Sequence, residues 1–301
     1  MWVVSTLQRF AKGLGCAALL SAAVVGAAAQ AQDFQIVVGE RVIVEGQEQV
    51  IFMSAEAFLV AQAQQNFFDI LPSVTSTQLG FNEPQMTAFF ACFIPATQTL
   101  VPFCDLSITL QRVPNSGSHD HDDPSRPLGR FEPASGNSGS DAIFETTYFS
   151  PEVSGVVSLT ATGVGPQGQI FGPLNLTIGV RVPGLKDLGT GANYNLVGQT
   201  AIHPVNHFGT PRFNGKLVKV ANVYAAAFPN NKLRYNDISL PLGGIFDLNA
   251  KWLPPHASHR FGVDIDIGLV PASQIRVLAI IIKGAGISTR LVESNHWHLR
   301  E

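Results

Sequence analysis

The sequence predicts two domains: an antiparallel β-sandwich over residues 32–183 and an α+β domain over residues 184–301. The chain has 301 residues, which is enough for two ordinary domains. Its first half holds short segments that alternate apolar and polar residues between turns rich in Gly, Pro and Asn. Its second half holds a helical pattern followed by two strand-like segments that carry histidine and aspartate.

Composition excludes two classes of protein. Apolar residues make up 46% of the chain and charged residues 14%, so an intrinsically disordered chain is excluded. Lys and Arg number 19 and Asp and Glu 22, a formal net charge of −3. Binding to a duplex needs a concentrated basic face, and the sequence has no such cluster. We therefore expect no nucleic-acid partner.

The first 31 residues have the pattern of a signal peptide. Arg9 and Lys12 precede the apolar stretch Gly13–Ala29, which ends at the small-residue triplet Ala29-Gln30-Ala31. A retained membrane anchor is the alternative, because 17 apolar residues fall just short of a span. We expect cleavage, export to the periplasm or the cell exterior, and no stable membrane insertion afterwards.

Period-2 alternation predicts most strands of the first domain. A short pair of strands is expected about the turn Gly39-Glu40, and a helix is expected over Ala55–Asn66. The stretch Tyr148–Ala161 resembles the late-strand turn of bacterial immunoglobulin-like domains, which implies an Ig-like sandwich. The short pair covers residues 34–38 and 41–45, and clean alternation covers residues 106–113, 156–162 and 174–180.

Two cysteines remain after signal cleavage, Cys92 and Cys104. An even count in an oxidising compartment permits one disulfide, which would stabilise the fold by about 3 kcal/mol. Two buried thiols on neighbouring strands are the alternative.

The pattern changes after the junction Pro183-Gly184-Leu185. Apolar residues then recur at helical spacing and stop at Pro229, which predicts an amphipathic helix. The run Val277–Ile282 is expected to be buried. The helical positions are Leu217, Val220, Ala221, Tyr224 and Phe228.

A histidine-rich loop lies in the first domain, at residues 119–123. His119, His121 and three aspartates in five residues can hold a metal. We favour a solvated loop, because adjacent ligands converge poorly without a scaffold.

The strongest chemical signal lies in the last fifty residues. If Val263–Ile267 is a strand, Asp264 and Asp266 share one face while the isoleucines enter the core. Gly262 lets the chain bend back, so that His259 reaches the same face. In an extended terminal segment, His296 and His298 also share a face.

These residues predict a metal site with an open position. His259, Asp266 and one histidine of the terminal pair supply three convergent ligands, a mixture that suits zinc best. The other histidine would accept a proton from bound water or stabilise an oxyanion.

The pattern also resembles a known group of enzymes. His259-x-x-Gly262-x-Asp264-x-Asp266 followed by His296-x-His298 resembles the lysostaphin/D-Ala-D-Ala peptidase/hedgehog group of zinc proteins. Within that group it is most similar to the penicillin-insensitive murein endopeptidases, which share His256-Ala257-Ser258-His259 and an upstream glycine pair, here Gly243-Gly244.

The resemblance covers about residues 185–301 and implies a fold, a cofactor and a reaction. The fold is a small antiparallel sheet flanked by helices. One Zn²⁺ would be held by His259, Asp266 and His298, with His296 as the catalytic partner. The D-Ala-D-Ala branch of the group uses Glu-x-x-His instead, which Glu293 and His296 also satisfy, but positions 293 and 296 face opposite sides of a regular strand. The reaction would be hydrolysis of amide bonds in peptidoglycan cross-links, or of a similar peptide, with metal-activated water as nucleophile.

Several further residues are expected around the site. His256 is expected to orient a ligand or contact substrate, and Asp264 and His256 are the candidates for a fourth ligand. Asn206 and His207 line the cleft or form a structural turn, and Asp237 has the same two interpretations.

Two functions therefore compete. The leading hypothesis is an exported metallopeptidase (hydrolase) of the cell wall. The alternative is a non-catalytic surface adhesion or interaction protein whose second domain keeps a structural metal, because fold alone does not determine activity.

Overall fold

The computed structural model describes residues 35–44, 47–53, 69–74, 83–119, 125–247, 258–292 and 295–301. In these ranges the fold is rich in β-strands, most of them antiparallel, and has two α-helices. Neither helix in these ranges is long and apolar enough to cross a membrane. Some predictions fall outside the described residues: the signal peptide, the helix over residues 55–66, and the roles of His121, Asp122, Asp123, His256 and Glu293.

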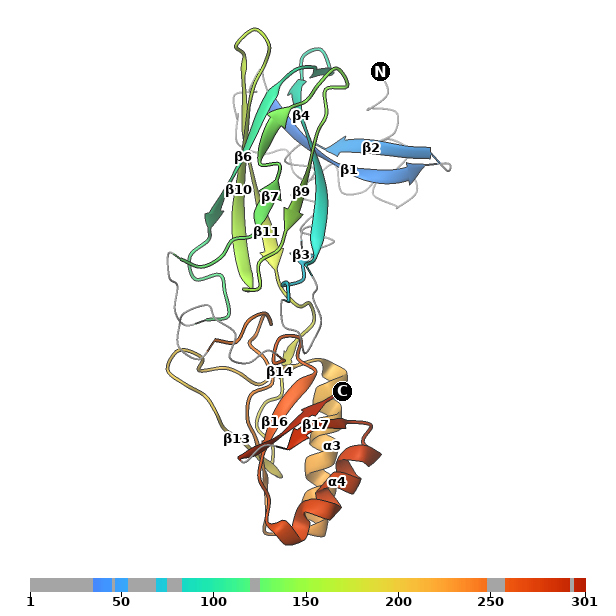
Figure 1. Ribbon diagram of the computed structural model, residues 1–301, viewed down its shortest axis with the longest axis vertical. Helices are drawn as coiled ribbons and strands as arrows, with labels where there is room; N and C mark the ends of the chain where they lie inside the picture. Colours follow the sequence, from blue (N-terminus) through green and yellow to red (C-terminus); the bar gives the residue numbers. More distant parts are fainter. Residues whose placement is uncertain are drawn as a thin grey trace, which may run out of the picture.

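Two sheets form the first half of the molecule, in the upper part of Figure 1. The first sheet has the strand order β2-β1-β4-β9-β7, and β5 pairs with β4. Its strands are β1 (Gln35–Val44), β2 (Gln47–Met53), β4 (Gln85–Ile94), β5 (Thr99–Val101), β7 (Arg130–Glu132) and β9 (Phe144–Phe149). All of their pairings are antiparallel.

The second sheet has the order β3-β11-β10-β6-β8. Its strands are β3 (Asp69–Ile70), β6 (Asp105–Arg112), β8 (Ser135–Asn137), β10 (Gly155–Val164) and β11 (Ile170–Val180). Only β3 and β11 run parallel in this sheet as described. Buried side chains from both sheets belong to one hydrophobic core. Burial alternates along β6, β10 and β11, so every second residue of these strands faces that core.

The predicted turn at Gly39-Glu40 is wrong. β1 continues through both residues, and Gly39 is paired with Phe52 of β2 and Phe89 of β4. Pairing on both sides keeps the glycine extended, which offsets its low strand propensity.

A disulfide joins Cys92 to Cys104 inside this core, where both residues are fully buried. Gly163 of β10 lies against it, since a Cβ at this glycine would stand 2.7 Å from Sγ of Cys92. The disulfide thus packs between strands of the two sheets.

A five-stranded sheet organises the second half, in the order β13-β15-β16-β18-β17. The strands are β13 (Tyr194–Leu196), β15 (Leu233–Tyr235), β16 (Asp264–Gly268), β17 (Ser288–Val292) and β18 (His296–Arg300). The pair β13 and β15 is parallel, so the expectation of a purely antiparallel sheet is wrong in this detail. A small separate ladder joins β12 (Lys186–Asp187) to β14 (Phe208–Gly209).

Two helices pack together beside this sheet, α3 (Pro211–Ala227) and α4 (Ile275–Gly284), the latter preceded by the 3-10 turn η2 (Ala272–Gln274) (Figure 1). Their buried side chains share a core with the inner faces of β15, β16 and β18. The helices therefore bury one face of the sheet and leave the other face for polar residues.

The helix α3 begins six residues before the first position of the predicted apolar pattern. Thr210 caps it by accepting a bond from the backbone N–H of Phe213 at 3.1 Å, and Pro211 suits the first turn because it has no N–H to satisfy.

The expectation of a fully buried run at Val277–Ile282 is wrong. In α4, Leu278 and Ile282 are buried while Val277 and Ile280 are exposed. One helical face meets the core, since positions four apart lie on the same side of a helix.

The two halves are joined by a buried ion pair. The Arg260 side chain is fully buried, and its Nη1 lies 2.8 Å from Glu152 and 3.2 Å from the carbonyl of Ser73. Nearby, the N–H of Ile245 donates to the carbonyl of Glu152 at 2.9 Å. The contact is therefore a packed interface in which one nitrogen of the Arg260 guanidinium, Nη1, is paired from both sides.

Candidate metal centre

Strand pairing places the acidic and histidine side chains on one face of the sheet. In the β16–β18 register, Asp266 lies opposite His298 and Gly268 lies opposite His296. Residues directly opposite in a ladder project to the same side. The alternate residues form the other face and are buried in the core: Ile265, Ile267, Trp297 and Leu299.

His259 reaches this face from the loop before β16. Gly262 has a φ of +68°, a conformation that favours glycine, and a Cβ there would come within 2.4 Å of Leu185. The bend lets the His259 ring lie with Nδ1 3.2 Å from the carbonyl of Ile238 and Nε2 3.3 Å from Oδ2 of Asp266. When Nδ1 donates to this carbonyl, Nε2 carries the lone pair that a metal needs.

Three ligand atoms converge here, one each from His259, Asp266 and His298. They lie within 4.8 Å of one another. Nδ1 of His298 is 2.8 Å from Oδ1 of Asp266, which completes the cluster. Two imidazoles and a carboxylate are a donor set that fits zinc, so the residues present fit the implied ion.

The carboxylates and imidazoles of the cluster lie close enough to shift one another's pKa values. Burial by itself would raise the pKa of Asp266, but hydrogen bonds from His259 and His298 outweigh it and hold this pKa below its usual range. Burial would lower the pKa of His298, but the carboxylates of Asp264 and Asp266 raise it to about 9. These shifts favour a protonated His298 beside an ionised Asp266, so an ion that binds here must displace the proton of His298.

Asp264 supports the site from behind. Its Oδ1 lies 3.4 Å from Nε2 of His298, on the side of the ring away from the nitrogen that faces Asp266, and 3.7 Å from Nε of Arg300. Asp264 is fully buried. This position, on the far side of the His298 ring from Asp266, suits a residue that orients the ring better than a fourth ligand.

His296 occupies the solvent side of the cluster. Its side chain is 20% exposed, against 12% for His298 and 1% for His259. Nε2 lies 3.4 Å from Oδ2 of Asp266, and Nδ1 lies 2.8 Å from Oδ1 of Asn295. When Nδ1 donates to Asn295, Nε2 is left as a proton acceptor directed at the cluster.

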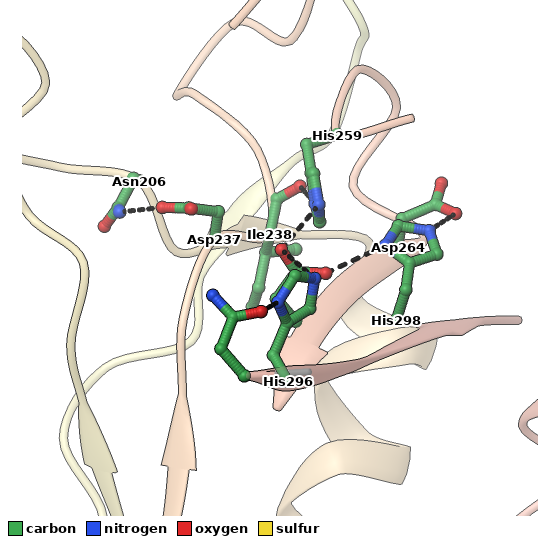
Figure 2. Close-up of polar contacts among 9 residues, drawn as sticks. Asn206, Asp237, Ile238, His259, Asp264, His296 and His298 are labelled. Atoms are coloured by element: carbon green, nitrogen blue, oxygen red, sulfur yellow. Dashed lines mark hydrogen bonds and ion pairs between the residues drawn. The ribbon is translucent and has the colours of Figure 1, made fainter. Parts of the chain in front are cut away.

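Asn206 and Asp237 lie on the side of the site away from His298, at the left of Figure 2. Asn206 is fully buried, and its side chain donates to Oδ1 of Asp237 at 2.5 Å while its carbonyl accepts from Ile238 N–H. Burial raises the pKa of Asp237 to about 6, with His259 and Asn206 acting in the opposite direction. These contacts hold the carbonyl of Ile238 that receives His259.

His207 has a different position from the one expected at a cleft. It is 3% exposed, and its Nε2 lies 3.1 Å from the carbonyl of Tyr235. Of the two interpretations of His207, a cleft-lining residue or part of a structural turn, its burial favours the structural turn. A buried ring that is bonded to the backbone has no access to a substrate.

Sequence patterns missed two contributors, Asn295 and the carbonyl of Ile238. Asn295 directly precedes His296, so its adjacency to the histidine pair was an available signal. The Ile238 carbonyl carried no signal, because a backbone acceptor is independent of side-chain identity.

The glycine pair Gly243-Gly244 has φ values of +69° and +78° and forms the turn where the N–H of Gly244 donates to the backbone carbonyl of Arg260.

Comparisons with known proteins add no relative: no protein-family model matches the chain, and neither does any curated protein.

Proposed function

We propose that the protein is an exported zinc metallopeptidase that hydrolyses amide bonds in peptidoglycan cross-links. In this proposal an immunoglobulin-like β-sandwich forms the N-terminal domain and the catalytic domain follows it in the sequence. One observation carries the proposal: the donor atoms of His259, Asp266 and His298 converge on the helix-free face of the sheet, and His296 stands on their more exposed side. This arrangement provides three ligands and a neighbouring proton acceptor.

Each residue has a distinct task in this reaction. His259, Asp266 and His298 hold the ion, which when bound supplies a Lewis acid that polarises the scissile carbonyl and makes water nucleophilic near neutral pH. His296 accepts or returns a proton at Nε2, with its ring oriented by Asn295. Asp264 fixes the ring of His298.

The alternative, an adhesion protein with a structural metal, requires a closed site. Asp264 is directed to the back of His298, so it does not close the cluster. His296, with one fifth of its side chain exposed, leaves an approach for a peptide. Among the described residues, which do not include His256, the geometry favours an open site, which is the catalytic type.

The test is digestion of isolated cell walls by the zinc-loaded mature protein. Products are separated by chromatography and identified by mass, and we expect cross-linked fragments to become monomers. A chelator should abolish the reaction and zinc should restore it. The control variant is Arg276→Gln, an exposed position in α4 on the helix side of the sheet, which should cleave at the wild-type rate.

A negative result is equally clear. If the protein holds zinc stoichiometrically but cleaves neither cell walls nor cross-link peptides, and if chelation changes only its thermal stability, the metal is structural. The adhesion alternative would then replace the peptidase.

A further inference from the structure

A second cluster of metal-type ligands lies apart from the catalytic candidate. It consists of His119, His203 and Asp247, whose donor atoms also lie within 4.8 Å of one another. His119 follows β6 of the first half, while the other two belong to loops of the second half. The sequence had placed His119 in a solvated loop, but its side chain is only 1% exposed, so that expectation is wrong for this residue.

The three donor atoms form a nearly regular triangle. Nδ1 of His119 is 2.9 Å from Nε2 of His203 and 3.1 Å from Oδ1 of Asp247. The third side, from His203 Nε2 to the same oxygen, is 3.5 Å. Ligands about 2.1 Å from a tetrahedral zinc ion stand about 3.4 Å apart, so the triangle has the dimensions of one face of a zinc coordination shell.

Local structure holds each ligand in place. Thr200 and His203 exchange two hydrogen bonds, and Phe246 packs edge-on against the His203 ring with centroids 4.9 Å apart. The His119 loop is fastened to the second half because Oγ of Ser118 accepts from the N–H of Leu242 at 2.6 Å. Positioned ligands of this kind lower the entropy cost of binding an ion.

Burial separates this cluster from the first one. The side chains of His203 and Asp247 are 0% and 1% exposed, whereas His298 and His296 of the first cluster are partly exposed. A site without access to solvent cannot admit a peptide, but it can fasten segments that are distant in the sequence. His119 and His203 are 84 residues apart.

We infer that His119, His203 and Asp247 bind a second divalent transition-metal ion, with zinc the best match, which joins the β-sandwich half to the metallopeptidase-like half. The ion has a structural role. Its ligands come from both halves, so its removal should weaken the interface between them. The inference is independent of the proposed peptidase activity, since no ligand is shared.

The experiment counts ions in the full mature protein. Apoprotein prepared with a chelator is loaded with Zn²⁺ alone, separated from free metal by gel filtration, and analysed for zinc per chain. We expect two ions in the wild type and one in each of His203→Ala, Asp247→Asn and His298→Ala. The double variant His203→Ala/His298→Ala should hold none.

The matched control is Asp141→Asn, which makes the same change as Asp247→Asn at an exposed position outside both clusters and should keep two ions. Thermal unfolding gives a second readout: zinc should raise the midpoint of His298→Ala but not that of the double variant. If the ligand variants fail to fold, the wild-type count decides, with two ions supporting the site.

The outcomes also distinguish the two metal sites. One ion per wild-type chain that is lost in His298→Ala and kept in His203→Ala overturns the second site. One ion that is kept in His298→Ala and lost in His203→Ala supports the second site and contradicts the proposed peptidase. If His203→Ala and Asp247→Asn both still hold two ions per chain, the second metal site is also overturned.

Discussion

Asp264 of β16 and His298 of β18 are diagonal neighbours on one face of the sheet, with Oδ1 of the aspartate 3.4 Å from Nε2 of the histidine. The other nitrogen of the same ring, Nδ1, is 2.8 Å from Asp266. One imidazole therefore connects a buried carboxylate to the ligand cluster. In metal proteins this arrangement fixes the ring and raises its basicity toward the ion.

The first prediction follows from this contact. Asp264→Asn should weaken zinc binding by about 10–100-fold, because His298 loses its orienting carboxylate while all three ligands remain. Affinity is measured by competition with a chromophoric chelator. Asp141→Asn, which removes an exposed carboxylate from the other half, controls for the change in net charge. Equal affinities in the two variants would contradict this role for Asp264.

A second prediction concerns the division of tasks between the terminal histidines. His298→Ala removes one of three ligands, so zinc at the first site should be lost together with activity. His296→Ala should keep the zinc and lower the rate of peptide hydrolysis by about 10²–10⁴-fold, the usual effect of losing a general base or an oxyanion partner. Zinc content and hydrolysis are measured on the same samples.

The reverse pattern is informative. If His296→Ala loses this ion and His298→Ala keeps it, the alternative pairing of Glu293 with His296 is correct. If both variants keep it, neither histidine is a ligand and the assignment of the first site fails.

The third prediction concerns the interface between the halves. Glu152→Ala leaves the guanidinium of Arg260 buried without its carboxylate, and this should cost about 3 kcal/mol of unfolding free energy. Glu132→Ala breaks an exposed pair with Arg130 and should cost at most about 1 kcal/mol. Urea unfolding followed by circular dichroism measures both. If both substitutions lower the unfolding free energy by the same amount, the buried pair stabilises the protein no more than the exposed pair does.

The fourth prediction is a pH dependence of stability. Burial lowers the pKa of His207 below 6.5, although hydrogen bonds to the carbonyls of Tyr235 and Val197 act against this shift. As the pH falls through 6.5, the unfolded chain therefore takes up a proton before the folded chain does, and stability decreases. One such group contributes a slope of at most about 1.4 kcal/mol per pH unit.

His207→Gln should accordingly show a shallower loss of unfolding free energy between pH 7 and pH 5 than the wild type. Glutamine retains a donor for the carbonyl of Tyr235 but does not titrate. The comparison is made by urea unfolding at several pH values. A slope as steep as that of the wild type would mean that His207 is protonated equally in both states.

Much of the first site follows from local pattern. A strand alternates its faces every residue, so the spacing of Asp264, Asp266, His296 and His298 is enough to put them on one side once both segments are strands. The bend at Gly262 was also visible, because few other residues adopt its conformation. By contrast, Gly39 shows that a glycine in an alternating segment does not determine a turn, since pairing on both sides keeps it extended.

Alternation within strands, helical spacing and the Gly262 bend are short-range properties, and the sequence by itself determined them because they depend on backbone geometry and on residues a few positions apart. Tertiary structure alone decided which nitrogen of His298 faces Asp266 and that Asp264 stands behind it. It also decided that His119 meets His203 and Asp247 rather than remaining in a solvated loop. Such contacts depend on how loops distant in the chain pack against one another, and no period in the sequence encodes that packing.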